Sequence, residues 1–407
     1  MAVKSGASIV TDSLVFAYDT NNQFRSYLGP VVSNVVGDRT LGGGNWAKSY
    51  TENNNLDDPI DKPPGVTQKV VSFTNSDANG GAHPTSACFW FNYSDDTPQD
   101  PSTTYSISLW IRTKGQNIQA RAYTANNEET GRQNTEDVIV PGDDKWHRVE
   151  WNPITTPADT QSDSLSFRFY DNIYPPEGQT IYLCAPQMTP TSYHIPFVDG
   201  SLTTSTSLKD WTGNRTITRN GTITDNSDFT FDLDGSSAYM QMSPIFNPYN
   251  SSYSLEAWIK RDATGRNDGI MSDLQYNWLN FWVSSSNKLS WKHGYYNEVP
   301  AETRNELIGV SDVGTDWTHV AVTFENGVGA KLYINGVLDN SNSNGNPFGL
   351  TGSRGVQFIG TIYNNVPSGT NGLEFDGQIA IARGYSRALT AGEVRMNFLA
   401  YRKRFGV

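Results

Sequence analysis

Apolar and polar residues alternate with a period of two along much of the chain, and this period predicts β-strands. In residues 105–112 the side chains of Ile107, Leu109 and Ile111 fall on one face, with polar residues and a tryptophan opposite. Residues 253–260 repeat this order of residue types. A strand led by tryptophan follows in each half of the chain. The repetition indicates two domains with related sandwich plans, and convergence on a common strand pattern is the alternative.

Local signals also predict a hairpin and a helix in the second half. Asn335-Gly336 separates two short apolar runs, and Asn-Gly is favoured in two-residue turns because both central residues need positive φ. Thr390 and Glu393 have the spacing of a capping box, which predicts the start of a C-terminal helix. The apolar stripe of this helix is formed by Val394, Phe398 and Tyr401.

Composition supports an all-β fold. Of the 407 residues only 36% are hydrophobic and 18% charged, whereas 20 Tyr, 18 Phe and 11 Trp favour strands. We predict two tandem antiparallel β-sandwich domains of the jelly-roll type with a short C-terminal helix. The expected division is a lead segment at 1–45, a first sandwich at 46–199 and a second at 200–407, with 201–207 as the linker.

Charge and cysteine content exclude several classes of protein. The formal net charge is −12, and the short basic run 402–404 is the one cluster of cations, so we expect no nucleic-acid binding. No apolar run approaches the ~20 residues of a membrane span, and no signal peptide is visible. Cys88 and Cys184 are too few for a disulfide scaffold or a Cys-rich zinc site, and two reduced thiols are favoured over one bridge.

The second half resembles the laminin-G-like, concanavalin A-like lectin/glucanase superfamily. The resemblance is carried by five blocks in the same order, at residues 254–260, 317–324, 331–337, 375–379 and 385–390. It implies a jelly-roll of two antiparallel sheets. The first half is similar, more loosely, to carbohydrate-binding-module jelly-rolls, through residues 105–112, 146–149, 167–170, 181–187 and 191–198.

The two chain ends resemble segments of structural proteins of tailed bacteriophages. Residues 9–19 are similar to a lead segment of such proteins, and 393–406 to the C-terminal end of phage laminin-G-like proteins. The resemblance implies a location in the virion, with residues 1–45 attached to other virion proteins. By the same analogy with fibres we expect a homo-oligomer, and specifically a trimer.

The sequence carries no recognisable catalytic motif. Glucanases on this fold usually place their carboxylates in a Glu-x-Asp-x-x-Glu run, which is absent here, and Glu256 has no acidic neighbour on its face. Nucleophile-elbow, phosphate-loop and His-Glu-x-x-His patterns are absent as well. We therefore predict a protein that is not an enzyme.

Glycan binding is the best chemical hypothesis, because sugar C–H faces stack on aromatic rings and hydroxyls bond to amides and charged groups. On a strand, four residues of the segment 276–282 share a face. The candidate sugar-binding residues are Tyr276, Trp278, Asn280, Trp282, Trp291 and Tyr295, with Trp90 in the first domain. The alternative is that two stacked sheets bury these rings in their core.

Calcium is the one cofactor that the family resemblance suggests. Asp234 and Asp376 each precede a glycine at plausible rim turns, and carboxylates are calcium ligands. Asp-Gly is also an ordinary turn dipeptide, so a purely structural role is the alternative.

Together these observations predict a phage virion protein, displayed as a fibre, spike or decoration, whose lectin-like domains contact host glycans during adsorption. A purely structural capsid, neck or tail component without ligand is the first alternative. A polysaccharide depolymerase with an unrecognised site is the second.

Overall fold

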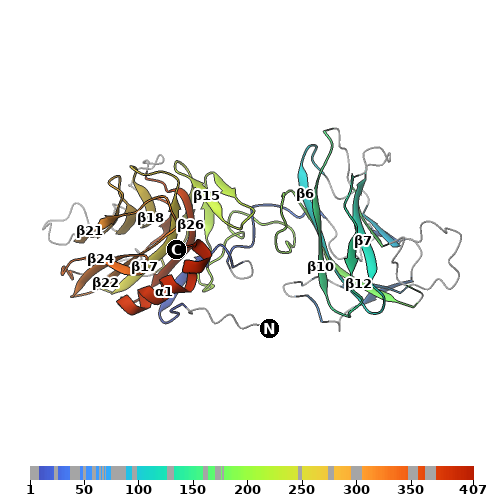
Figure 1. Ribbon diagram of the computed structural model, residues 1–407, viewed down its shortest axis with the longest axis horizontal. Coiled ribbons are helices and arrows are strands. Elements are labelled where there is room, and N and C mark those ends of the chain that lie inside the picture. Colours follow the sequence, from blue (N-terminus) through green and yellow to red (C-terminus); the bar gives the residue numbers. More distant parts are fainter. Residues whose placement is uncertain are drawn as a thin grey trace. The chain divides into compact units, whose positions relative to one another are not determined.

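The structure is a computed structural model, shown in Figure 1. It describes residues 9–22, 26–36, 46–48, 52–56, 61–63, 66, 68, 70–74, 89–93, 99–125, 133–158, 164–169, 176, 178–245, 250–273, 279–294, 305–346, 356–362 and 373–407. These residues form strands and turns, with a single helix at the C-terminus, and every strand pairing among them is antiparallel. The predicted all-β fold class is confirmed.

The chain forms two compact units, and one of them is discontinuous. Residues 31–202 are the first domain, and residues 1–30 together with 203–407 are the second domain. This division differs from the predicted lead segment at 1–45, because β1 (Leu14–Asp19) pairs with β26 (Asp376–Tyr385) inside the second domain. The first domain is thus inserted after the first strand of the second, so the two are not strictly tandem.

Two sheets make up the first domain. One has the order β10-β6-β12-β4-β3, and the other the order β2-β5-β11-β7-β8 with β9 also on β7. The strands are β2 (Trp46–Lys48), β3 (Glu52–Leu56), β4 (Val70–Thr74), β5 (Phe89–Tyr93), β6 (Thr104–Thr113), β7 (Ile118–Ala125), β8 (Gln133–Asn134), β9 (Val138–Val140), β10 (His147–Thr155), β11 (Ser164–Phe169) and β12 (Thr180–Thr189).

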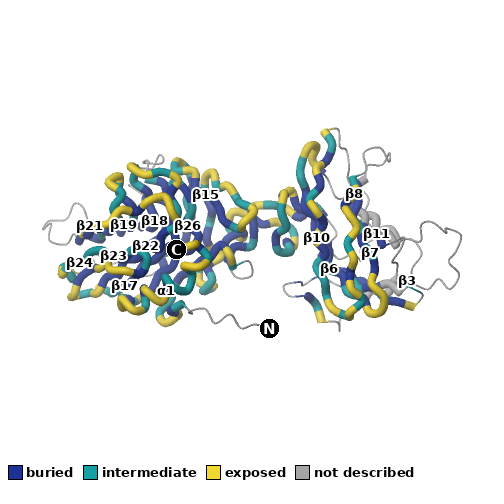
Figure 2. Tube along the Cα trace, viewed as in Figure 1, coloured by how far each residue is buried: buried dark blue, intermediate teal, exposed yellow. Residues whose placement is uncertain are grey.

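The core of the first domain follows the predicted alternation. Ile107, Leu109 and Ile111 are all buried in it, as expected for one face of β6. Trp151 of β10 stacks on Phe167 of β11, with ring centres 5.6 Å apart. The inward faces of the two sheets therefore meet in one apolar layer, which Figure 2 shows as buried positions along the strands.

Two further sheets make up the second domain. Sheet A has the order β14-β15-β26-β17-β22-β23-β24, with β1 also on β26, and sheet H has the order β13-β16-β25-β18-β19-β20-β21. The strands not yet given are β13 (Thr218–Asn220), β14 (Ile223–Asp225), β15 (Phe231–Asp234), β16 (Tyr239–Gln241), β17 (Tyr253–Arg261), β18 (Asp268–Ser272), β19 (Leu279–Val283), β20 (Lys288–His293), β21 (Asn305–Asp312), β22 (Thr318–Glu325), β23 (Gly329–Ile334), β24 (Val337–Ser341) and β25 (Phe358–Ile359).

The predicted hairpin and helix are both present. Asn335 and Gly336 join β23 to β24 with φ of 50° and 75°, as a two-residue turn of this type requires. Helix α1 (Ala391–Phe405) begins at Thr390, whose side chain accepts the amide of Glu393 while the Glu393 carboxylate accepts the amide of Thr390. The capping box is therefore confirmed.

The repeated strands occupy matching places in the two domains. Trp110 of β6 lies opposite Arg148 and Cys184 on its two neighbours, and Trp258 of β17 lies opposite His319 and Ile381. In the first domain β6 lies between β10, which follows the second tryptophan, and the long strand β12. In the second domain β17 lies in the same way between β22 and the long strand β26. The predicted likeness of plan is therefore present in the strand order.

Two smaller expectations concern membranes and thiols. Within the described part of the chain no helix has the length and apolarity needed to span a bilayer. Cys184 is a buried free thiol, and burial raises its pKa to about 12. Cys88 lies outside the described residues.

The position of β1 makes a prediction about stability. Phe16 is completely buried in the core of the second domain, so Phe16→Ala should destabilise that domain by about 3–5 kcal/mol. Val31→Ala, at a side chain 46% exposed, should change stability by less than about 0.5 kcal/mol. Urea unfolding of the full chain followed by tryptophan fluorescence measures both. If residues 1–45 were only an attachment segment, the two variants would unfold alike.

Candidate functional site

The outer face of sheet A carries a buried polar cluster around Glu256. Its neighbours on β17, Leu255 and Ala257, point into the core, so Glu256 projects to the opposite side. Arg383, which pairs with Glu256 from the neighbouring strand β26, donates from Nη1 to Glu256 Oε1 at 2.7 Å. His319 Nε2 lies 3.4 Å from Glu256 Oε2. All three side chains are at most 1% exposed, because α1 covers this face.

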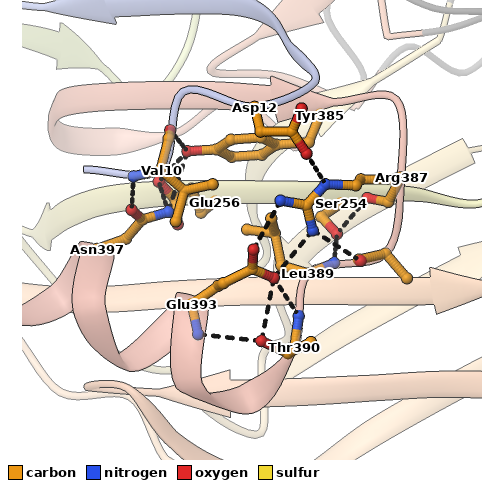
Figure 3. Close-up of polar contacts among 11 residues, drawn as sticks. Val10, Asp12, Ser254, Glu256, Tyr385, Arg387, Leu389, Thr390, Glu393 and Asn397 are labelled. Carbon is orange, nitrogen blue, oxygen red and sulfur yellow. Dashed lines mark hydrogen bonds and ion pairs between the residues drawn. The ribbon is translucent and has the colours of Figure 1, made fainter.

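Helix α1 and the N-terminal segment close this cluster (Figure 3). Asn397 donates from Nδ2 to both oxygens of Glu256, at 3.1 and 3.0 Å. The amide of Val10 donates to Asn397 Oδ1 at 2.8 Å, and the Tyr385 hydroxyl lies 3.2 Å from the Val10 carbonyl and 3.3 Å from Glu256 Oε1. The cluster therefore links both chain ends to the centre of the sheet.

The electrostatics of the cluster keep Glu256 ionised. Burial by itself raises the pKa of Glu256, but the charge of Arg383 and the contact with His319 outweigh it and hold that pKa at about 2. Burial and the nearby carboxylate raise the pKa of Tyr385. Glycoside hydrolysis needs a pair of carboxyl groups facing one sugar bond. Glu256 is instead enclosed, and its hydrogen-bond partners are a guanidinium, an amide and a hydroxyl.

A second polar network lies where β26 runs into α1. Arg387 donates to Glu393 Oε1 and Oε2 at 2.7 and 2.9 Å, and to Asp12 at 2.9 Å. A pocket of about 410 Å³ opens beside it. The residues that line this pocket are Ser252, Glu325, Lys331, Arg387, Ala388, Leu389, Thr390 and Ala391. None of them is aromatic, so the pocket offers no ring on which a sugar could stack.

The outer face of sheet H contains two of the predicted sugar-binding residues. Leu279, Phe281 and Val283 are fully buried in the core, so Asn280 and Trp282 lie on the opposite face of β19. Trp282 is half-buried, whereas Asn280 is 3% exposed. The predicted alternation is thus correct, and the ring of Trp282 does not belong to the inter-sheet core.

Neighbouring strands extend this face. Trp282 pairs across the sheet with Ser290, and Ser290 pairs with Ile308, so the three form one row. Ile308 is 50% exposed, and Val310 on the same strand is 63% exposed. A parallel row joins Asn280, Lys292 and Glu306. The sheet H face, defined by these two rows and Val310, therefore combines one aromatic ring, apolar side chains and charged groups of both signs.

Trp291 is a correction to the predicted set. It is fully buried, with its ring 5.8 Å from that of Phe324 and 4.8 Å from that of His293. It points into the core because Trp291 pairs with Phe281 and Leu307, which share the inward face. Its ring has no exposed surface for a sugar. Tyr276, Trp278 and Tyr295 lie outside the described residues, as does the side chain of Trp90 in β5.

The two predicted calcium ligands are engaged by the protein itself. Asp234 Oδ1 accepts the amides of Ser236, Ser237 and Ala238, which is the geometry of a structural turn. Asp376, which pairs with Asp234 across the strands, bonds to Arg266 at 2.9 Å. Within the described ranges no group of three or more His, Cys, Asp or Glu side chains is placed to hold a metal ion. Calcium binding stays a prediction.

The match to one known protein family agrees with this architecture. Residues 233–395 match the concanavalin A-like lectin/glucanases superfamily, so this part of the chain is a domain of that kind. No curated protein matches the chain.

The sequence identity between this chain and solved structures is low. The receptor-binding domain of the botulinum neurotoxin C/D mosaic serotype is 16% identical over 48% of this chain and 49% of its own, with a TM-score of 0.37. The binding domain of Paraclostridial Mosquitocidal Protein 1 is 17% identical over 48% and 49%, with a TM-score of 0.37. Domain 4 of AbnA, an arabinanase from Geobacillus stearothermophilus in complex with arabinotriose, is 23% identical over 47% and 91%, with a TM-score of 0.35. The match spans about half the length of the two toxin domains.

The sequence patterns missed two residues that matter for the cluster. Asn397 lies three residues after Val394, on the buried stripe of α1, and a polar residue at such a position signals a buried hydrogen bond. Arg383 sits amid small and apolar residues on β26, which is an equally readable signal of a buried cation.

Removing the charge of Glu256 should lower the stability of the second domain. Glu256→Gln leaves Arg383 buried without its counter-ion, and should destabilise the second domain by about 3–5 kcal/mol at neutral pH. Glu325→Gln, at an exposed side chain, should change stability by less than about 0.5 kcal/mol. Denaturant unfolding of the full chain measures both.

A pH dependence follows from the same cluster. The pKa of Glu256 is lowered in the folded state, so its contribution is complete above the ordinary value of 4.5 and is lost as the pH falls towards about 2. The free energy of unfolding of Glu256→Gln should therefore vary less between pH 4.5 and pH 2 than that of the unmodified protein. Denaturant unfolding at a series of pH values measures this. Parallel curves would show that Glu256 is not the buried anion described here.

Proposed function

We propose that this protein is a non-enzymatic component of a bacteriophage particle, a fibre, spike or decoration, whose lectin-like domains bind glycans of the host surface. The observation that carries the glycan-binding part is the outward position of Trp282 in a lectin-like domain. A partly exposed ring on the outer face of a sheet can stack on the C–H face of a sugar, and Lys292 and Glu306 nearby can bond to hydroxyls.

The absence of catalysis in this proposal is supported by the state of Glu256. Its carboxylate is ionised, buried and bonded to Arg383 and Asn397, so it can neither reach a sugar nor exchange a proton with one at neutral pH. Weak binding at single sites would be amplified by many copies on a particle, as a homo-oligomeric fibre or decoration provides.

The location in a virion is supported by the resemblance of both chain ends to phage proteins and by their shared place in the fold. Residues 9–19 and α1 lie on the same domain, joined through Val10 and Asn397. The two segments that carry the resemblance thus pack as one unit. Gold-labelled antibodies against the protein, viewed on purified particles by electron microscopy, test this part: labelling of intact particles supports it, and labelling confined to cell lysate contradicts it.

A structural role without a ligand is the second candidate. Ile308 and Val310 are exposed beside Trp282, and apolar side chains on an open sheet face also suit a protein neighbour.

Removal of the Trp282 ring decides between the two candidates. Trp282→Ala should weaken binding to the preferred sugar on a glycan array at least about tenfold, and Trp282→Phe should retain part of it, because a ring is kept. Val337→Ala, at a side chain 60% exposed on β24, serves as the surface control and should bind normally. Absence of binding by the intact protein to any glycan would favour the structural role, and release of reducing sugar would favour an enzyme.

A further inference from the structure

Helix α1 is held firmly by one of its faces. Trp258 of β17 stacks against Phe405 at 4.3 Å and against Phe398 at 5.7 Å between ring centres. Arg404, in the last turn, bonds to Asp19 at 2.5 Å, and the capping box fixes the first turn. The opposite face is therefore presented as a pre-organised surface, with both ends of the helix anchored.

That opposite face is a single stripe. Its members are Arg395, Met396, Leu399, Arg402 and Lys403, which recur at the i, i+4 and i+7 spacing of one helix face. We call these five residues the α1 outer face. Its three cations are exposed, Met396 is 39% exposed and Leu399 is half-buried.

Ion pairs account for other charged side chains of this helix, but not for the cations of the α1 outer face. Arg404 pairs with Asp19 and Glu393 pairs with Arg387, whereas the three cations of the α1 outer face form no ion pair with any described residue. A cation in the last turn stabilises the helix dipole, which would explain Arg402 and Lys403. It does not explain Arg395, which lies in the second turn of the helix, outside the last turn where the dipole favours a cation.

We propose that the α1 outer face is a docking surface for an acidic protein surface with apolar side chains among its carboxylates. The chain carries a net charge of −12, so three exposed cations on one stripe, with no carboxylate partner among the described residues, mark a local reversal of sign. Complementary charge steers association and selects partners, and exposed apolar side chains supply the buried area. Arg and Met are enriched at protein interfaces, and this stripe combines two arginines with a methionine.

A long polyanion fits this surface less well than a protein does. Nucleic acids and acidic polysaccharides bind through many cations at once, and the rest of this acidic chain would repel them. The inference is independent of glycan binding. Residues 9–22 and 26–30, predicted to be part of an attachment segment, belong to the second domain instead, where β1 pairs with β26.

Charge reversal on the full chain tests the proposal. The probe is an immobilised synthetic peptide in which glutamates alternate with leucines and phenylalanines, with heparin and phosphatidylserine vesicles in parallel. Arg395→Glu, Arg402→Glu and Lys403→Glu in one variant should weaken peptide binding at least about tenfold, because attraction becomes repulsion. Lys114→Glu, Lys145→Glu and Lys331→Glu, which change the net charge by the same amount at exposed sites, should bind within about twofold of the unmodified protein. Thermal unfolding confirms that both variants are folded.

Four outcomes would overturn the proposal. The first is no binding of the unmodified protein to the peptide, and the second is an equal loss in both triple variants, which would show an effect of net charge alone. The third is tighter binding to heparin or to the vesicles, which would assign the surface to a polymer or a membrane. The fourth is self-association in sedimentation velocity that the helix variant abolishes, which would make a second copy of this chain the occupant.

Discussion

A buried carboxylate, Glu256, links a strand, the C-terminal helix and the N-terminal segment of the second domain. Taking the charge of Glu256 out of water costs several kcal/mol, and the cost is offset only while Arg383 and Asn397 keep their geometry. These partners come from different parts of the chain, and Asn397 in turn receives the amide of Val10. Glu256 therefore couples three features: the register of β26, the position of α1 and the course of the N-terminal segment. A shift in any of them would leave a buried charge or donor unpaired.

The outer faces of the two sheets in the second domain differ in what covers them. The outer face of sheet A is covered by α1, so Trp258 stacks on helix residues rather than on a ligand. On the outer face of sheet H, Trp282 is half-buried and Ile308 is exposed. One sandwich thus has an outer face covered by its own chain ends and a second outer face on which these two side chains are at least partly exposed. This contrast is the structural basis of the proposed binding role, in which the face of sheet H, not the buried Glu256, contacts the ligand.

Much of the fold could be predicted because strand alternation, the Asn335-Gly336 turn and the Thr390 capping box are local signals. Alternation also identified correctly which residues of β17 and β19 share a face. It could not tell what covers that face. Trp258 and Trp282 both point away from the core, yet α1 fully buries Trp258, whereas Trp282 on sheet H is only half-buried. The place of β1 was missed for the same reason, since its partner Tyr385 is hundreds of positions away in the sequence. Trp291 was misplaced because its pairing with Phe281 is a matter of register between strands.

Hydrogen–deuterium exchange on Glu256→Gln measures most directly whether one carboxylate joins these elements. If it does, backbone amides in residues 9–19 and in α1 should lose protection together, while β19 and β20 of sheet H keep theirs, because opening would be confined to the elements that share the cluster. Unchanged protection in residues 9–19, with α1 alone affected, would contradict the account.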